Sequence, residues 1–370
     1  MLNEMDQLGP GRGIRRSERL QEGKLIASAI VAYVLCYVFL TVGLKFDMMR
    51  SDVMGYWNES FRLTTPYSTW WVPGYPYAIA LIRTVTLGML QPLLVMVLIS
   101  LASYVVAALA VYRLAQVYNA KSPMWWALVF SAFPFVGLTY SVYPVADSLA
   151  IALFLLTLLM YRRRHWFAFG LTLALAMLTQ KAIWFFVLPL MVVVVLRHRE
   201  GRVPVLCSTM PLLVLFLAGA FYHRDLFWLV RWSTETLLVS RSALPVFDGI
   251  FGSIFLGGTA QILKGVIALA LFVLAIFLMV WNFRQGHWVE GSVALGIVLM
   301  GIIINHYEIW AMVRFSKVLI VSLVCYAAGQ SMSQSSERWS SALWFRLFVT
   351  MGLMSNLMYG YYMAKFYFSQ

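Results

Sequence analysis

Apolar segments too long for the core of an ordinary soluble protein recur from one end of this chain to the other. The segments 25–44, 90–112 and 263–283 carry almost no charged residue, and about 18 apolar residues in a row are enough to cross a bilayer as a helix. Of the 370 residues, 62% are hydrophobic and 12% are charged, whereas soluble domains have about 25% charged residues. The sequence therefore predicts an all-α, polytopic membrane protein.

The apolar segments divide the chain into about 11 spans with long outer loops between some of them. We expect spans at 25–44, 90–112, 124–141, 144–161, 166–180, 183–196, 204–222, 263–283, 289–304, 318–332 and 341–364. A basic tail at 1–24, a first outer loop at 45–89 and a second long outer loop at 223–262 complete a single domain. The first apolar segment is longer than the apolar part of a typical signal peptide, so we expect it to be retained as a span.

Positive charges in the short loops set the expected orientation. The cations Arg113 and Lys121, the run 162–164, the cluster 197–202 and Arg284 all fall on the side of the basic tail. Cytoplasmic loops are enriched in Lys and Arg, so these loops are predicted to be cytoplasmic. The chain has a net charge of +13, but its Lys and Arg residues fall in short clusters between apolar spans, as topology determinants do, and we therefore do not expect a nucleic-acid partner.

The three cysteines give no sign of metal chemistry in the sequence. Cys36, Cys207 and Cys325 each lie inside an apolar segment, without a second cysteine or a histidine at the spacing of metal ligands. We interpret all three as small buried apolar side chains.

The first outer loop contains a short helix with acidic residues. Asp52, Tyr56 and Glu59 follow the i, i+4, i+7 spacing of one helix face, and Ser51 is placed to cap that helix. Aromatic side chains in the same segment would hold it at the membrane interface. The face is either a site for chemistry or a solvated acidic surface anchored by aromatic rings.

A proline-rich segment follows in the same loop. Pro73 and Pro76 enclose Gly74 and Tyr75, and apolar residues then lead to Arg83. Two prolines at this spacing predict a rigid turn between elements. The turn could anchor a re-entrant loop, or it could hold the Asp52 helix against a substrate groove.

Other ionisable residues are predicted on this same outer side. Asp147 lies in the first turn of one span, and Lys181 occupies a short turn between two others. Arg314 and Lys317, preceded by His306, open a late span. Asp147 could interact with the helix dipole and each cation could extend to the interface. Charged groups beside a membrane are costly unless they have partners or face water, so their number on one side indicates a functional site.

In this order, the motifs resemble the GT-C superfamily of lipid-phosphosugar-dependent glycosyltransferases. The closest resemblance is to the mannosyltransferases that add the second mannose to GPI anchors, and to their bacterial relatives. It covers roughly residues 45–190 and a late arginine. The matching residues are Asp52 with Tyr56, Val72–Pro76 through Arg83, Tyr143–Ser148, Thr179–Lys181, and Arg314 with Phe315. The chain departs from the family where Lys181 stands one place beyond the family's arginine, where a glycine is missing from that turn, and where Asp147 replaces a glutamate.

The resemblance implies an inverting transfer of a sugar, mannose-like, from a polyprenyl-phosphate donor to a lipid-linked or cell-surface glycan. The protein would be a multi-pass protein of a bacterial inner membrane, with its active site facing the periplasm. By residue match Asp52 would be the general base. Cations would stabilise the leaving lipid phosphate, and the candidates are Lys181, Arg314, Lys317 and Arg231. The other candidate substrate-binding residues are Tyr56, Glu59, Tyr75, Asp147 and His306.

No cofactor other than the donor lipid is expected, and no metal. We find no Gly-rich loop between a strand and a helix that would bind a nucleotide. Two other functions remain open. A lipid-linked glycan flippase or transporter would place ionisable residues near the middle of the membrane, where this sequence has few. A polysaccharide polymerase or O-antigen ligase would carry a large outer loop late in the chain, which 223–262 resembles.

Overall fold

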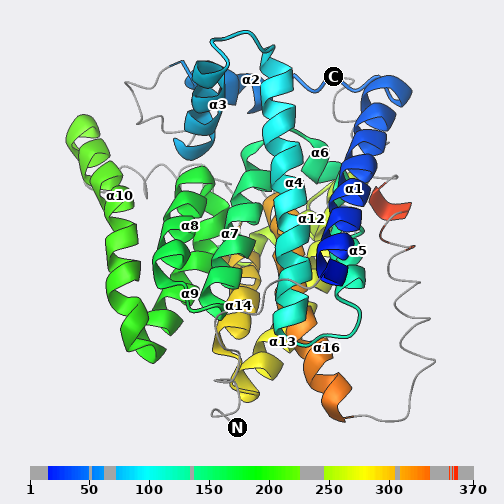
Figure 1. Ribbon diagram of the computed structural model, residues 1–370, viewed down its shortest axis with the longest axis vertical. Helices are drawn as coiled ribbons and strands as arrows, with labels where there is room; N and C mark the ends of the chain where they lie inside the picture. The colour runs from blue at the N-terminus through cyan, green and yellow to red at the C-terminus, as the bar shows by residue number, and fades with distance from the viewer. Residues whose placement is uncertain are drawn as a thin grey trace.

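The computed structural model describes residues 16–49, 52–61, 72–133, 137–225, 246–304 and 309–333, together with positions 350, 352 and 354–356. Every regular element in these ranges is a helix, and the long helices lie side by side as a bundle (Figure 1). The prediction of an all-α protein is confirmed.

The helices of the described chain vary in length. In chain order they are α1 (Arg16–Val38), η2 (Phe39–Gly43), α2 (Asp52–Glu59), α3 (Gly74–Val85), α4 (Pro92–Val117), α5 (Pro123–Ser131), α6 (Leu138–Val142), α7 (Ala146–Arg162), α8 (Trp166–Thr179), η3 (Lys181–Ile183), α9 (Trp184–Arg197), α10 (Arg199–His223), η4 (Asp248–Gly252), α12 (Ser253–Phe255), α13 (Thr259–Arg284), α14 (Trp288–Ile303), α15 (Ile309–Phe315), η5 (Ser316–Leu319) and α16 (Ile320–Ser333).

Five helical segments of the described chain are long and apolar enough to cross a membrane. They are Arg19–Gly43, Pro92–Val117, Arg199–His223, Gln261–Arg284 and Ile309–Gly329. The first four coincide with predicted spans, whereas Ile309–Gly329 begins nine residues before the predicted span 318–332. The predicted spans at 144–161, 166–180, 183–196 and 289–304 are also helices, but these have only 14 to 17 residues. At 1.5 Å per residue they are about 21–26 Å long, shorter than the roughly 30 Å hydrocarbon core.

Two of the predicted spans need a separate comment. The span 124–141 is not one helix, because α5 ends at Ser131 and α6 begins only at Leu138. The apolar composition of the segment outweighed two signals for the break, because Pro134 and Gly137 lie between the two helices and both residue types interrupt helices. The predicted span 341–364 falls almost entirely outside the described residues.

Helix α7 defines the two ends of the bundle. Asp147 lies in its first turn and Arg162 is its last residue, so the two are about 22 Å apart along the helix. We call these the Asp147 end and the Arg162 end. Helices α2 and α3 lie at the Asp147 end, at the top of Figure 1. The start of α1 contacts the last turns of α4 at the Arg162 end, where Tyr112 donates a hydrogen bond to Gln21.

Aromatic rings fill the middle of the bundle. Phe186 of α9 packs against Phe154 of α7 and Phe315 of α15, with ring centroids 5.6 and 6.4 Å apart. A Cβ atom on Gly296 of α14 would lie 2.5 Å from the Phe186 ring, so only glycine fits there. Small residues let membrane helices approach closely, and here one makes room for the ring that joins three helices.

The proline-rich segment was predicted to form a rigid turn between elements. In the structure it forms the start of helix α3. Pro73 is the N-cap of α3, and Pro76 lies in its first turn, where the missing N–H is one that the helix would leave unsatisfied in any case. A Cβ atom on Gly74 would lie 2.6 Å from the carbonyl oxygen of Leu178. Glycine therefore lets α3 lie against the last turn of α8, just before Lys181.

Candidate functional site

Asp147 is the centre of a polar cluster at its end of the bundle. Its carboxylate is buried, with 2% of the residue exposed. Arg314 of α15 places Nη1 3.1 Å from Oδ2, and Gln180 donates a hydrogen bond from Nε2 to Oδ1 at 2.7 Å. The sequence predicted that a carboxylate at this depth needs a partner, and the structure supplies two from distant parts of the chain. The helix dipole alone does not account for its surroundings.

Gln180 connects Asp147 to Lys181. Its side-chain Oε1 accepts a hydrogen bond from the backbone N–H of Lys181 at 2.9 Å, while its Nε2 binds Asp147. One amide therefore fixes both the carboxylate and the start of η3. Gln180 was not among the predicted site residues. The available signal was a polar residue directly before the one cation of a short turn.

Arg314 makes further contacts with an aromatic residue of α6. It donates from Nη1 to the Tyr140 hydroxyl at 2.8 Å, and its guanidinium lies 5.0 Å from the centroid of the same ring. Tyr140 in turn packs edge-on against Tyr143, at 6.2 Å between centroids. Arg314 is thus oriented by a carboxylate and a ring together. Tyr140 was not among the predicted site residues.

Lys317 lies one helical turn beyond Arg314. Its Nζ donates to the Ser141 hydroxyl at 3.1 Å, and only 2% of the residue is exposed. The sequence allowed two interpretations of this cation, extension to the membrane interface or a place in a functional site. Because the Lys317 side chain is buried among helices, it does not extend to the interface. The helix runs from Ile309 through Ser333, so Arg314 and Lys317 lie inside it and do not precede a span that begins at 318.

The short acidic helix of the first loop is α2, which begins at Asp52 as the spacing predicted. Asp52 is exposed, Glu59 at the other end of the helix is half-buried, and Tyr56 is buried. The Tyr56 ring packs edge-on against Tyr75 at 4.9 Å. This face therefore runs from solvent into the protein, and a fully solvated acidic surface does not describe it. Ser51, the predicted cap, lies outside the described residues.

Tyr56 joins α2 to the rest of the cluster. Burial raises the pKa of its hydroxyl well above the ordinary value, and the nearby charges of Asp147 and Asp52 raise it further. A phenol in this setting stays protonated and can donate a hydrogen bond. Tyr75, which is fully buried beside it, supports the ring.

Arg83 holds α2 against α3. Its Nη1 donates to the Ser60 hydroxyl at 3.2 Å and its Nη2 to the Ser60 carbonyl at 3.3 Å. The guanidinium also lies 3.7 Å from the centroid of the Phe61 ring. The proline-rich segment that ends at Arg83 was predicted either to anchor a re-entrant loop or to hold the Asp52 helix in place. These contacts favour the second role.

Lys181 lies in η3, which packs against α7 and α15. The residue is half-buried, and this burial lowers the pKa of its ammonium to about 7. Near neutral pH the side chain is therefore divided between its charged and neutral forms, and an anion bound beside it would favour the charged form.

We use the name Asp147 cluster for Tyr56, Tyr140, Asp147, Gln180, Lys181, Arg314 and Lys317. The structure thus brings five predicted site residues together, with Tyr75 behind Tyr56 and Asp52 at the start of α2. Arg231 and His306, also predicted, lie outside the described residues.

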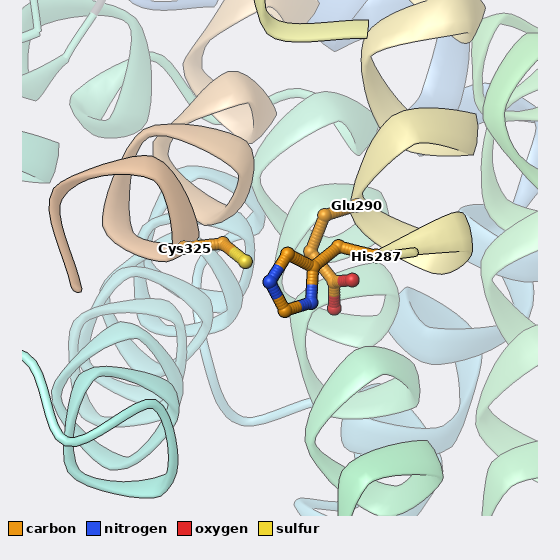
Figure 2. Close-up of side chains that lie close together, drawn as sticks. All are labelled: His287, Glu290 and Cys325. Carbon is orange, nitrogen blue, oxygen red and sulfur yellow. The ribbon is translucent and has the colours of Figure 1, made fainter. Parts of the chain in front are cut away.

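A second polar group lies at the Arg162 end. Glu290 of α14 is fully buried and forms an ion pair with Arg162, with Nη2 2.5 Å from Oε1. His287 and Cys325 lie beside it (Figure 2). Arg162 was predicted only as a topology residue, and Glu290 was not among the predicted site residues. A glutamate within an otherwise apolar helix was the signal that could have identified the pair.

The cysteines differ from one another. Cys325 is buried and Cys36 half-buried, but Cys207 is exposed on α10. The expectation that all three are buried is wrong for Cys207, because an apolar segment can turn one side away from its neighbouring helices.

A scan against known protein families finds no matching family, and a search of curated proteins finds no relative of this chain.

Proposed function

We propose that the Asp147 cluster is the active site of a membrane glycosyltransferase that moves a sugar, mannose-like, from a polyprenyl-phosphate donor to a glycan acceptor on the non-cytoplasmic side. One observation carries the proposal. Cationic and phenolic side chains from α2, α6, α15 and η5 gather around a buried carboxylate at one end of an apolar bundle, and Gln180 links that carboxylate to the backbone of η3. A donor with a lipid tail could place its phosphate there while the tail stays in the membrane.

The cations suit a lipid phosphate that leaves during the reaction. A phosphodiester carries one negative charge, and a second charge develops on the leaving oxygen as the sugar–oxygen bond breaks. Lys181 is the first candidate to stabilise this second negative charge. Burial lowers the pKa of its ammonium, and a bound anion would favour the protonated, positively charged form. Arg314 is held by Asp147 and Tyr140, so it is already oriented before the substrate arrives.

Asp52 suits the general base better than Asp147 does. Both oxygens of Asp147 are engaged, one by Gln180 and the other by Arg314, and the group is buried. Asp52 is exposed at the start of α2, and its charge acts on both Tyr56 and Tyr140. In the proposed step the acceptor oxygen attacks the anomeric carbon, the bond to the phosphate oxygen breaks, and the acceptor proton passes to Asp52.

The distribution of cations supports the orientation. Arg113 forms an ion pair with Glu22 at the Arg162 end, and Arg197 lies over the Trp288 ring at 4.1 Å. Because cytoplasmic loops are rich in Lys and Arg, this end would face the cytoplasm and the Asp147 cluster the outside.

A lipid-linked glycan transporter is the second candidate. Lys317 and Glu290 are both buried inside helices, whereas the sequence analysis found few charges within spans. Buried ionisable residues are common on transport pathways. Each of these two groups nevertheless has a polar partner close to one end of the bundle, which favours fixed sites over a continuous path.

The deciding experiment compares transfer with transport. Purified protein is incubated with a panel of polyprenyl-phosphate sugars and glycolipid acceptors, and sugar transfer is followed directly. In parallel, the protein is reconstituted in vesicles and movement of a labelled lipid-linked glycan between leaflets is measured. Sugar transfer that is abolished by Asp52→Asn supports the enzyme. Leaflet exchange without transfer would replace it with the transporter.

A further inference from the structure

Glu290 uses only one of its two carboxylate oxygens for hydrogen bonds. Oε1 accepts from Arg162 Nε at 3.0 Å and Nη2 at 2.5 Å, and also from the Tyr118 hydroxyl. Oε2 is equally buried, and no hydrogen-bond donor of the described residues reaches it. A buried carboxylate oxygen without a partner costs about 1–3 kcal/mol or more, so a ligand that binds it would relieve that cost.

Two metal-ligating side chains face this carboxylate. His287 comes from the connection between α13 and α14, and Cys325 from α16. One ligand atom from each of the three residues lies within 4.8 Å of the other two. Figure 2 shows the imidazole of His287 between the sulfur of Cys325 and the carboxylate of Glu290.

We propose that His287, Glu290 and Cys325 bind one divalent transition-metal ion of the zinc class at the Arg162 end. One nitrogen, one sulfur and one oxygen ligand form a set typical of tetrahedral Zn²⁺, with water in the fourth position. Ligand atoms in such a site are about 3.5 Å apart, so the side chains would close by about 1 Å. The thiol of Cys325 releases its proton to solvent as the sulfur binds the ion.

The surroundings of Glu290 resemble the outer shell of a metal site. Ligating carboxylates are commonly held by further hydrogen bonds on the oxygen that does not bind the ion. Arg162 and Tyr118 do this for Oε1. Ser322 fixes the backbone as well, because its hydroxyl donates to the Glu290 carbonyl at 2.7 Å, one turn before Cys325. The positions of α14 and α16 are thus set before any ion arrives.

Such an ion would fasten three segments together and not take part in sugar transfer. It would join α14, α16 and the connection after α13, about 22 Å along α7 from the Asp147 cluster. The sequence analysis expected no metal, because Cys325 has no histidine near it in the chain. The site is assembled across helices, and only the pair His287 and Glu290 is close in sequence.

Cobalt is a suitable probe because its thiolate complexes absorb light. Untagged full-length protein, stripped with a chelator, is titrated with Co²⁺ and then with Zn²⁺. We expect one Co²⁺ per chain with a sulfur-to-cobalt charge-transfer band, which Zn²⁺ removes. Cys325→Ser should abolish the band, while Cys207→Ser, which changes an exposed cysteine, should keep it. No band in the unchanged protein, or a band that survives Cys325→Ser, would overturn the proposal.

A second variant covers the case in which Cys325→Ser fails to fold. His287 is half-buried and lies just before the first residue of α14, so His287→Gln should fold. We expect it to weaken Co²⁺ binding at least tenfold and to remove the rise in melting temperature that Zn²⁺ gives the unchanged protein. Equal Co²⁺ affinity and an equal rise in the variant would overturn the site.

Discussion

The two ends of α7 each hold a buried carboxylate beside an arginine, but their surroundings differ. At the Arg162 end, the side chains of Arg162 and Glu290 bind each other and the Tyr118 hydroxyl, with His287 and Cys325 beside them. At the Asp147 end, Asp147 and Arg314 also bind Gln180 and Tyr140, and the charge of the exposed Asp52 at the start of α2 acts on Tyr140. A closed pair holds helices together, whereas a pair that extends to the surface through several polar groups can also bind a charged substrate.

The largest expected effect is on catalysis at the Asp147 end. Asp52→Asn keeps the size of the side chain but cannot accept a proton, so kcat should fall by about 10²–10⁴ while donor binding is retained. Asp47→Asn is the matched control, since Asp47 is exposed and its carboxylate accepts a hydrogen bond from the Met49 N–H of a neighbouring turn. Full activity in Asp52→Asn would show that Asp52 is not the general base. If Asp47→Asn lost activity and Asp52→Asn did not, Asp47 would be the general base.

The closed pair should matter for folding more than for activity. Glu290→Ala leaves the half-buried Arg162 charge without its partner; breaking a fully buried pair costs about 3–5 kcal/mol of stability, and we expect a loss at or below the lower end of that range. Glu200→Ala, at an exposed position of α10, is the control. Thermal unfolding in detergent should show a large drop in the first variant and almost none in the second. An unchanged melting temperature in Glu290→Ala would mean that the ion pair does not stabilise the bundle.

Donor binding should depend on the cation of η3. Charge-assisted hydrogen bonds contribute about 1.5–3 kcal/mol, so Lys181→Ala should weaken binding of a polyprenyl-phosphate sugar by about 10- to 150-fold. Lys121→Ala changes an exposed lysine between α4 and α5 and should bind normally. Equal dissociation constants for Lys181→Ala and the unchanged protein would exclude Lys181 from the phosphate site.

The pH dependence of the same binding should reveal which lysine is involved. The pKa of Lys181 is lowered to about 7, and the phosphate diester binds the charged form. Affinity should therefore be full below that value and fall as pH rises through it, approaching tenfold per pH unit. Lys181→Arg keeps its charge over this range and should bind with little change between pH 6 and pH 9. A pH profile shared by the two proteins would assign the titration to another group.

The orientation of the two ends can be tested without loss of function. Single cysteines at Asn58 and Arg163, both exposed, should leave activity and stability nearly unchanged in a background in which the exposed native Cys207 is replaced. An impermeant thiol reagent should label Asn58→Cys from outside and Arg163→Cys only after the membrane is opened. Labelling of both from one face would contradict the proposed topology.

Much of the site was visible in the sequence as separate residues. The spacing of Asp52, Tyr56 and Glu59 predicted α2, and the depth of Asp147 predicted a charged or polar partner. The identity of the partners was not predictable, because Arg314 and Gln180 come from other helices. Tyr140 escaped notice because its segment was predicted as part of an unbroken span.

The sequence by itself determined the helical membrane class and the approximate positions of the five long spans, because hydrophobicity acts locally and persists over the length of a helix. The tertiary structure decided which charges meet. Arg162 and Glu290 are 128 residues apart in the chain, and a count of loop cations cannot distinguish a topology residue from one held in a buried ion pair. Helix packing placed Glu290, His287 and Cys325 together and brought Lys181 and Arg314 to the same end. The reason is physical: burying a charge requires a partner, but the partner's identity depends on how whole helices pack.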